Sequence, residues 1–333
     1  MIKPGKLIIL FMAVLFASCG RGCGLSSMPS LPGIGLSGLY AGCLDGKLVV
    51  AGGCNFPDKP VTEGGRKKFY DEIWTLEGDA WRLSGHLPAP SAYAAYVSRG
   101  DTLFVIGGAD TEGTHDTVWA LTEDGITALQ PLPKPIEQAA WCDSPQGIYV
   151  AGGLSNGDGS LGVFLFDGSV WTEVAQLPRP IVQGIAMVSG GRLCIWGGYD
   201  PSCRYALTCG YALDPESGIW DILPDAGVTF VGSSIVGGFA FGGCDATVMS
   251  DALKLSSDKV REYQSQPQEY YRFRGEVLRL DADTMEWDRV IESGHLARAG
   301  AAVAQVGKQV IFAGGEIKPG VRTPEVWSIG LGK

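Results

Sequence analysis

The 333-residue sequence predicts an all-β fold, a six-bladed β-propeller, from three observations. An apolar segment that ends in two glycines recurs six times. The segments that follow each glycine pair repeat as well, and the last repeat lacks one strand that the start of the chain can supply. The six pairs are Gly52-Gly53, Gly107-Gly108, Gly152-Gly153, Gly197-Gly198, Gly242-Gly243 and Gly314-Gly315.

The spacing of the glycine pairs argues against chance recurrence. The first glycines are separated by 55, 45, 45, 45 and 72 residues, so three successive intervals are identical. This period resembles that of kelch repeats, each of which forms one four-stranded blade. Two glycines suit the end of the second strand of a blade, because glycine adopts a tight, left-handed backbone at little steric cost.

Each repeat continues with a third and a fourth strand. The third strands are apolar, as at residues 73–76, 118–121, 163–166 and 326–329. Four of the fourth strands carry a tryptophan, and a Leu-Pro step into the next blade follows the fourth strand of each of the first four blades. We expect these tryptophans to be wedges between neighbouring blades, and not ligand platforms. They are Trp81, Trp171, Trp220 and Trp287.

The ends of the chain predict how the ring closes. The sequence ends on the third strand of the sixth blade, at residues 327–331, which leaves that blade without a fourth strand. Residues 25–31 end in the same Leu-Pro step that follows the fourth strands of the first four blades. We therefore expect residues 25–31 to complete the last blade and to remove an open sheet edge. The predicted propeller domain spans residues 25–333.

The start of the sequence has the pattern of an export signal. Two lysines precede an apolar run over residues 7–16, which is too short to span a bilayer stably. The run ends in Ala-Ser-Cys, which resembles the lipobox of bacterial lipoproteins; the alternative is an ordinary signal peptide followed by an incidental cysteine. We expect a lipoprotein signal peptide over residues 1–18, a lipid on Cys19, a tether over residues 19–24, and a periplasmic location at the outer membrane.

Charge and cysteine content narrow the function further. The formal net charge is −10, which argues against nucleic acid as a partner. The nine cysteines include no Cys-x-x-Cys pair, which argues against a zinc site, and no other metal or cofactor is expected. We expect most of the cysteines to be small buried fillers, although Cys203 and Cys209 could form a bridge in an oxidising compartment.

Three long loops follow glycine pairs, at residues 54–68, 245–270 and 316–324. In a propeller such loops surround one mouth of the central channel, and they belong here to the adjacent blades five, six and one. They therefore predict a pocket. Candidate polar residues in these loops, and in the segments that lead into the first strands, are Asn55, Lys59, Glu63, Tyr93, Gln138, Gln183, Arg298, Glu316 and Arg322.

A carboxylate and a guanidinium at such a mouth suit proton transfer and carboxylate binding, or form an ordinary ion pair. The stretch Gly-Gly-Glu-Ile-Lys-Pro-Gly-Val-Arg-Thr at residues 314–323 resembles the N-acetylneuraminate epimerase (sialic acid mutarotase) family. So does Asn-Phe-Pro with Glu-Gly-Gly-Arg-Lys-Lys within residues 55–68. The order resembles the cyclically permuted branch, in which the glutamate–arginine loop lies in the last blade. Residues 245–270 do not align with that pattern.

The resemblance implies that the protein interconverts the α and β anomers of N-acetylneuraminate, a sugar acid, without a metal or organic cofactor. It implies that Glu316 and Arg322 form the catalytic pair. Glu316 would move the proton during ring opening and closure, and Arg322 would hold the sugar carboxylate or the opening oxygen. The remaining candidates would be substrate contacts: Asn55, Lys59, Glu63, Arg298, Gln138, Gln183 and Tyr93.

Other classes of protein fit less well. Kelch-like copper-radical oxidases need paired histidines, whereas the three histidines here lie in separate loops. A sialidase needs an arginine triad and Ser-x-Asp-x-Gly-x-Thr-Trp boxes, which this sequence lacks. The alternative that stays open is a non-catalytic propeller that binds a glycan or a protein partner. Such a binder could lose Glu316 and keep its affinity, whereas a mutarotase would lose turnover.

Overall fold

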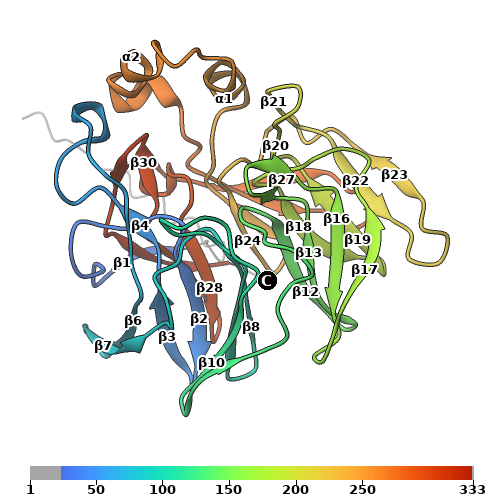
Figure 1. The fold of residues 1–333 in the computed structure, drawn as a ribbon, viewed down its shortest axis with the longest axis horizontal. Helices are drawn as coiled ribbons and strands as arrows, with labels where there is room; N and C mark the ends of the chain where they lie inside the picture. The colour runs from blue at the N-terminus through green and yellow to red at the C-terminus, as the bar shows by residue number, and fades with distance from the viewer. Residues whose placement is uncertain (1–23, 332–333) are drawn as a thin grey trace, which may run out of the picture.

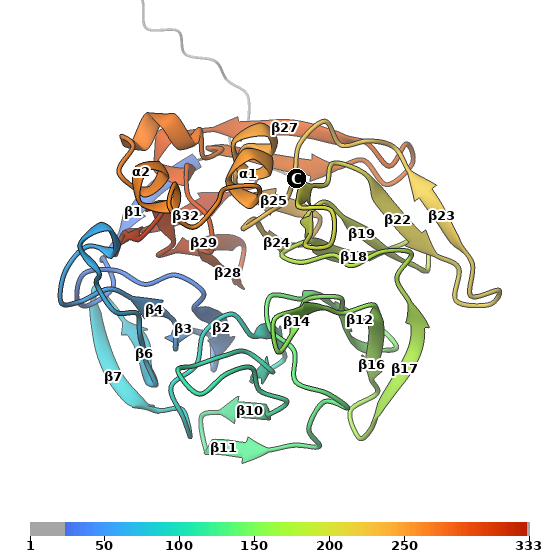
Figure 2. The same ribbon diagram turned by 45° about the horizontal axis from the view of Figure 1, so that its top comes forward.

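A computed structural model describes residues 24–331 of the chain. Six four-stranded antiparallel sheets stand in a ring around a central channel, which confirms the predicted six-bladed β-propeller (Figures 1 and 2). The predicted signal peptide, most of the tether and the lipid site at Cys19 lie outside the described residues. No helix within residues 24–331 is long and apolar enough to cross a membrane.

The strands of each blade run from the channel outward. Blade one contains β2 (Tyr40–Leu44), β3 (Lys47–Ala51), β6 (Glu72–Glu77) and β7 (Ala80–His86). Blade two contains β8 (Ala95–Arg99), β9 (Thr102–Ile106), β10 (Val118–Thr122) and β11 (Gly125–Ala128). Blade three contains β12 (Ala140–Ser144), β13 (Gly147–Ala151), β16 (Gly162–Phe166) and β17 (Trp171–Gln176).

The second half of the ring repeats this order. Blade four contains β18 (Ile185–Ser189), β19 (Arg192–Trp196), β22 (Gly210–Leu213) and β23 (Trp220–Leu223). Blade five contains β24 (Ser234–Val236), β25 (Phe239–Phe241), β26 (Glu276–Leu280) and β27 (Trp287–Glu292). Blade six contains β28 (Ala302–Val306), β29 (Gln309–Ala313), β32 (Val326–Gly330) and β1 (Gly24–Met28).

Short elements decorate the face that carries the loops between second and third strands. Two-stranded hairpins are β4 (Cys54–Asn55) with β5 (Lys68–Phe69), β14 (Leu154–Ser155) with β15 (Asp158–Gly159), β20 (Tyr199–Asp200) with β21 (Tyr205–Ala206), and β30 (Glu316–Lys318) with β31 (Val321–Arg322). The helices are η1 (Val61–Glu63), α1 (Ala246–Leu253), α2 (Val260–Gln264), η2 (Gln268–Tyr271) and, outside these loops, η3 (Gly294–Leu296).

The ring closes as the sequence predicts. β1 pairs antiparallel with β32, with Leu25 opposite Ile329, and so supplies the missing fourth strand of blade six. The strand ends at Met28 because Pro29 follows, and proline cannot donate to a ladder. The chain then crosses to blade one, where Leu31 donates its N–H to the carbonyl of Pro324 at 2.8 Å and its side chain is buried.

Each glycine pair docks its blade onto the next one. In the pair of blade two, both glycines are left-handed, with φ of 69° and 98°. The N–H of Gly108 donates to the carbonyl of Ile136, in the segment that leads into blade three, at 2.8 Å. A Cβ atom at Gly107 would stand 2.2 Å from that same carbonyl oxygen. The pairs therefore recur because the backbones of neighbouring blades approach too closely for a side chain.

The outer tryptophans are inter-blade wedges, as expected. The indole Nε1 of Trp81 donates to the carbonyl of Pro29 at 2.9 Å. Trp171 and Trp220 donate in the same way to carbonyls of the preceding blade, at 3.1 and 2.8 Å. Trp287 instead packs against the rings of Trp196 and Phe230, with centroids 5.3 and 5.0 Å away. The hydrophobic core is thus divided into clusters that lie between successive blades.

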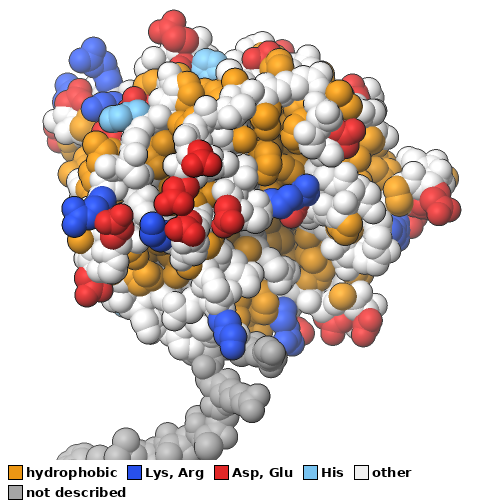
Figure 3. All heavy atoms as spheres, turned by 90° about the horizontal axis from the view of Figure 1, so that it is seen from below, with side chains coloured by type: hydrophobic (Ala, Val, Ile, Leu, Met, Phe, Trp, Pro, Cys, Tyr) orange, Lys and Arg blue, Asp and Glu red, His pale blue; other side chains and the backbone are white. Residues whose placement is uncertain are grey.

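The cysteines within residues 24–331 are all free thiols, so Cys203 and Cys209 do not form the bridge considered from the sequence. Most are small fillers at least partly screened from solvent, and Cys203 is exposed. No group of three histidine, cysteine or acidic side chains in this part of the chain is placed to hold a metal ion. Seen from below, the surface shows acidic and basic side chains interspersed among hydrophobic ones (Figure 3).

Candidate active site

The three long loops meet above one mouth of the channel. Helices α1 and α2 of blade five, hairpin β30–β31 of blade six and the β4–β5 loop of blade one lie on the same face of the ring (Figure 2). Lys318 donates its Nζ to the carbonyl of Gln266 in the blade-five insertion at 2.8 Å. Val61 of η1 lies against the turn at Gly320, where a Cβ atom would stand 2.4 Å from its side chain. The blade-six hairpin is therefore held between its two neighbours.

That hairpin brings Glu316 and Arg322 together. A turn at Pro319-Gly320 reverses the chain, and Glu316 then stands opposite Arg322 in the β30–β31 register. Arg322 Nη2 lies 2.7 Å from Glu316 Oε2. The arginine side chain is 5% exposed and the glutamate side chain is 22% exposed, so the pair is largely withdrawn from water and the glutamate is the more exposed partner.

The Arg322 guanidinium is only partly used by the protein. Its Nε donates to Ser37 Oγ at 3.0 Å, and its Cζ lies 4.9 Å from the centroid of the Phe56 ring. Its Nη1 is buried and has no hydrogen-bond partner among residues 24–331. Buried polar groups are rarely left unpaired, so this nitrogen points to an anionic ligand such as a carboxylate.

The environment of Glu316 favours a proton carrier. Burial raises the pKa of its carboxyl above the ordinary value, and this outweighs the opposing effects of Arg322, the Gly320 N–H and Lys67. A carboxyl whose pKa moves toward neutrality can both take and return a proton near physiological pH.

Tyr93 adds a hydroxyl donor to the same mouth. Its Oη accepts hydrogen bonds from Cys54 Sγ at 3.1 Å and from Lys67 Nζ at 3.3 Å, which leaves its own proton free to donate. Burial, and next the neighbouring Cys54 thiol, hold the pKa of Tyr93 well above its usual value, with a smaller contribution from Glu316. The hydroxyl is therefore protonated at neutral pH.

Gln138 and Gln183 also come to this mouth. Gln183 Nε2 donates to Gln138 Oε1, and Gln138 Nε2 donates to Glu137 Oε2 at 2.9 Å. Together with Tyr93 and Lys67 these residues line an open cavity of about 440 Å³. That volume lies in the range of about 300–1,000 Å³ typical of small-molecule sites.

The structure does not bring the other blade-one candidates to the pair. Asn55 is buried, and its amide is occupied: Nδ2 donates to the carbonyl of Gly35 at 3.1 Å, and Oδ1 accepts from Tyr70 Oη at 2.7 Å. Lys59 and Glu63 are exposed on the loop and form no ion pair in the described part of the chain. As substrate contacts, these three residues find no support in the geometry.

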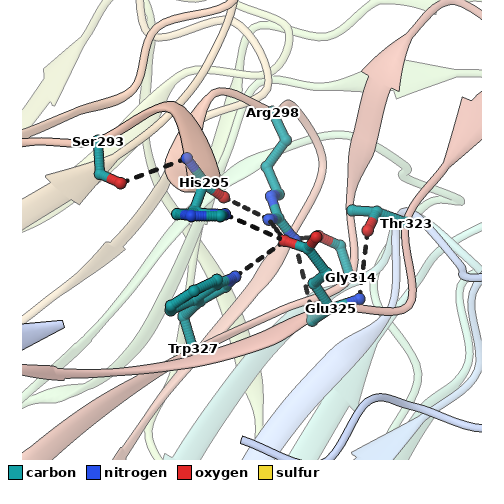
Figure 4. A network of polar contacts seen from close by, with 7 residues as sticks. All are labelled: Ser293, His295, Arg298, Gly314, Thr323, Glu325 and Trp327. Carbon is teal, nitrogen blue, oxygen red and sulfur yellow. Dashed lines mark hydrogen bonds and ion pairs between the residues drawn. The ribbon is translucent and has the colours of Figure 1, made fainter. Parts of the chain in front are cut away.

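Arg298 lies in the interior of blade six and not at the mouth. Its side chain is 2% exposed, and its Nη2 pairs with Glu325 Oε2 at 2.9 Å (Figure 4). Its guanidinium also donates to the carbonyls of His295, Gly314 and Glu325. Glu325 in turn accepts from the Trp327 indole at 2.9 Å. Arg298 therefore clamps the two ends of the loop that carries the Glu316–Arg322 pair, and the expectation that it touches a ligand is not supported.

Three residues that support the site were not singled out from the sequence: Ser37, Cys54 and Lys67. Ser37 and Cys54 face each other across a backbone bridge, with Cys54 N donating to Ser37 O at 2.9 Å. Lys67 belongs to the Arg-Lys-Lys run of the blade-one loop, and its charge was the available signal.

Comparison with known proteins concerns the first two blades. Residues 28–129 match the family described as N-acetylneuraminate epimerase. The resemblance to this family is confirmed over that segment. The N-acetylneuraminate epimerase of Salmonella enteritidis PT4 is 36% identical over 101 residues, which are 26% of this chain and 26% of the relative. That of Yersinia pestis (strain Pestoides F) is 32% identical over 89 residues, 24% of this chain and 23% of the relative.

The similarity to N-acetylneuraminate epimerases thus spans about a quarter of the length of these relatives. It includes the blade-one loop with Lys67 and the lead-in segment with Tyr93, both of which face the mouth. Glu316 and Arg322 lie beyond the matched segment. Their roles are therefore argued from geometry and from the motif that surrounds them.

Proposed function

We propose that this protein interconverts the α and β anomers of N-acetylneuraminate by acid–base opening and closure of the sugar ring. The observation that carries the proposal is the enclosed Glu316–Arg322 pair, in which one guanidinium nitrogen is buried without a partner among residues 24–331, beside a glutamate side chain that is 22% exposed. The choice of N-acetylneuraminate as the substrate rests on the similarity of blades one and two to the N-acetylneuraminate epimerase family. The enzyme is then an isomerase that acts on a sugar acid.

The proposed reaction needs one proton carrier and one anion holder. Arg322 Nη1 binds the sugar carboxylate, which places the anomeric carbon near Glu316. The Glu316 carboxylate takes the proton of the anomeric hydroxyl as the bond between the anomeric carbon and the ring oxygen breaks, and it gives that proton to the ring oxygen. The product is the open-chain keto acid.

Closure reverses these steps on the other face. The chain rotates about the bond to the keto carbon, and the hydroxyl formed from the ring oxygen attacks the opposite face of the carbonyl. Glu316 takes the proton of the attacking hydroxyl and returns it to the new anomeric oxygen, so no net proton is consumed. Acid–base assistance of this kind contributes about 10²–10⁴-fold, which is useful for a reaction that already proceeds slowly in water.

The proposal is tested by NMR on freshly released α-N-acetylneuraminate, with and without the purified protein. Catalysis predicts faster relaxation of the anomeric signals toward equilibrium, in proportion to protein concentration. Equal relaxation rates of the anomeric signals in both samples would refute the proposal that the protein is a mutarotase. If the sugar acid then binds without accelerated exchange, the propeller is a glycan-binding module.

We also propose that the protein is exported and attached to the outer membrane through a lipid on Cys19, facing the periplasm. The signal-like residues 1–18 and the Ala-Ser-Cys step support this location. Mass spectrometry of the membrane-fraction protein would detect the lipidated cysteine. A Cys19→Ser variant should move to the soluble periplasmic fraction, and wild-type protein found only in that fraction would exclude the anchor.

A further inference from the structure

Six equivalent residues form a ring around the mouth of the channel, one in front of the first strand of each blade. All six have a left-handed backbone, and peptide hydrogen bonds of 2.8–2.9 Å join neighbours at five of the six steps. This channel ring consists of Gly38 (φ 66°), Tyr93 (63°), Gln138 (55°), Gln183 (56°), Gly232 (69°) and Gly300 (62°).

Half of the channel ring retains side chains at a conformational cost. A left-handed backbone costs a non-glycine residue about 1–2 kcal/mol, and glycine avoids this cost at the other three positions. Crowding accounts for Gly38 and Gly232, where a Cβ would stand 2.6 and 2.7 Å from a neighbouring side chain, but not for Gly300, where it would have no neighbour closer than 3.6 Å. Strained side chains persist where the site needs them.

The two glutamines are joined to a fixed acceptor and keep free polar groups. Glu137 accepts from Gln138 Nε2 through one oxygen and from Thr114 Oγ1 through the other, at 2.9 and 3.1 Å. Gln183 donates to Gln138, which completes the series. Within the described residues, one N–H of each side-chain amide and the side-chain carbonyl of Gln183 remain free to bind a ligand. Such a set of donors and one acceptor matches hydroxyl and N-acyl groups.

The charges around the cavity distinguish it from the proposed anion site at Arg322. Lys67 is the one cationic residue among those that line the 440 Å³ cavity, and its ammonium is directed at Tyr93. Asp110 and Glu137 are the acidic ones. A carboxylate would gain little here, whereas Arg322 stands ready for it in blade six. Neutral, hydroxyl-rich groups suit the cavity better.

We propose that Gln138 and Gln183, backed by Glu137 and Thr114, form a subsite for the polyhydroxylated tail of the sugar acid. The substrate lies across the mouth, with its carboxylate at blade six and its tail at blades two to four. This inference rests on the proposed function, since it assigns the far end of the same substrate. The subsite determines specificity, and the two glutamines bind substrate without moving protons.

The test compares two sugars in the anomer-exchange assay. One is N-acetylneuraminate, and the other is the same sugar acid with a shortened glycerol tail, prepared by periodate oxidation and reduction of a glycoside that is then hydrolysed. For Gln138→Gly and Gln183→Gly we expect KM for the full-length sugar to rise about tenfold or more, as for the loss of one or two hydrogen bonds. KM for the shortened sugar should change by less than about threefold, and kcat should stay similar.

Strain gives the same variants a second readout. Because glycine relieves the left-handed backbone, both variants should melt at or above the wild-type temperature. Asp45→Gly is the matched control: it removes another left-handed residue (φ 46°), from the β2–β3 turn, and should leave discrimination between the sugars unchanged. A lower melting temperature in the glutamine variants would contradict the strain argument and the role drawn from it.

The outcomes separate the two proposals. Wild-type protein that accelerates neither sugar overturns the proposed function and this subsite with it. Wild-type protein that is active, while the glutamine variants weaken both sugars equally or neither, overturns the subsite alone. Loss of discrimination with retained kcat and stability supports it.

Discussion

Blade six contains two glutamate–arginine pairs, and the pKa values of the two carboxyls are shifted in opposite directions. Burial raises the pKa of Glu316 and outweighs the attraction of Arg322. Burial would also raise the pKa of Glu325, but hydrogen bonds from Trp327 and Arg298 outweigh it, and the net pKa is lowered. The isosteric variants Glu316→Gln and Glu325→Gln should therefore separate catalysis from stability.

The signs follow from proton linkage. Because its pKa is raised, the Glu316 carboxyl holds its proton more tightly in the folded state than in the unfolded state. Its protonated form therefore stabilises the fold at low pH, and this contribution is lost as the pH rises through the folded pKa. Glu316→Gln should match wild type at pH 4 and melt at or above it at pH 8. Glu325 has the opposite sign: its contribution is complete above the unfolded pKa of about 4.3 and is lost as the pH falls through the lowered folded pKa.

The magnitudes come from the contacts. Glu325→Gln replaces two hydrogen bonds of 2.9 Å to a carboxylate, one of them from a guanidinium, with weaker ones to a neutral amide. The side chain is 44% exposed, so after solvent screening we expect a loss of about 1–2 kcal/mol at pH 7. Each kcal/mol lowers the melting temperature by roughly 2–4 °C in domains of 150–250 residues, and by slightly less in this larger one. Glu316→Gln should lose about 10²–10⁴-fold in anomer exchange, whereas Glu325→Gln should keep most of it.

Thermal melts from pH 4 to 8, together with anomer exchange by NMR, check both variants. If Glu316→Gln melts as far below wild type at pH 7 as Glu325→Gln does, then burial is not the largest influence on the pKa of the Glu316 carboxyl. Full activity in Glu316→Gln would remove that residue from the mechanism while sparing the function.

Three further perturbations test the fold around the site. Arg298→Ala should cost about 2–5 kcal/mol, because it leaves carbonyls of the loop clamp unpaired, and it should slow anomer exchange by displacing the loop; chemical denaturation and the NMR assay would show both. Trp171→Phe should cost about 1 kcal/mol more than Trp287→Phe, since the Trp171 indole donates to a carbonyl, whereas the buried Nε1 of Trp287 has no partner within residues 24–331; equal losses in urea would contradict this. Removal of residues 1–28 should expose the edge of β32 and promote association, which size-exclusion chromatography would detect as a shift from the elution of the full chain.

The repeat in the sequence was sufficient for the blades and for the closing strand, because glycine pairs and Leu-Pro steps recur in a fixed register. It failed where that register is interrupted. No Leu-Pro step precedes blade six, and Arg298 was predicted, with Tyr93, to lie at the mouth in a lead-in segment. The structure aligns it with Ser91 instead: the carbonyls of Ser91 and Arg298 each accept from the second glycine of a pair, at 2.8 and 2.9 Å. A two-residue offset moved the side chain from the channel into the interior.

The site was predictable to the extent that it is local. Glu316 and Arg322 share one hairpin, so their meeting follows from a turn between them. The contact of Lys67 with Tyr93 joins different blades, and no spacing in the sequence encodes it. The blade-five insertion was expected as a loop, but it contains two helices. Asp245, whose carboxylate accepts from the N–H groups of Thr247 and Val248, caps the first of them and was the available signal.

The closing strand also constrains the order of folding. Among the described strands, β1 is synthesised first and its partner, β32, last, so the sixth sheet cannot form until all the other strands have been made. Contacts this distant in sequence slow folding. The waiting segment Gly-Leu-Ser-Ser-Met is short and half polar, which limits misplaced pairing in the interval. Closure of the ring is thereby deferred until β32 has been made, although β1 has been available from the start of the described chain.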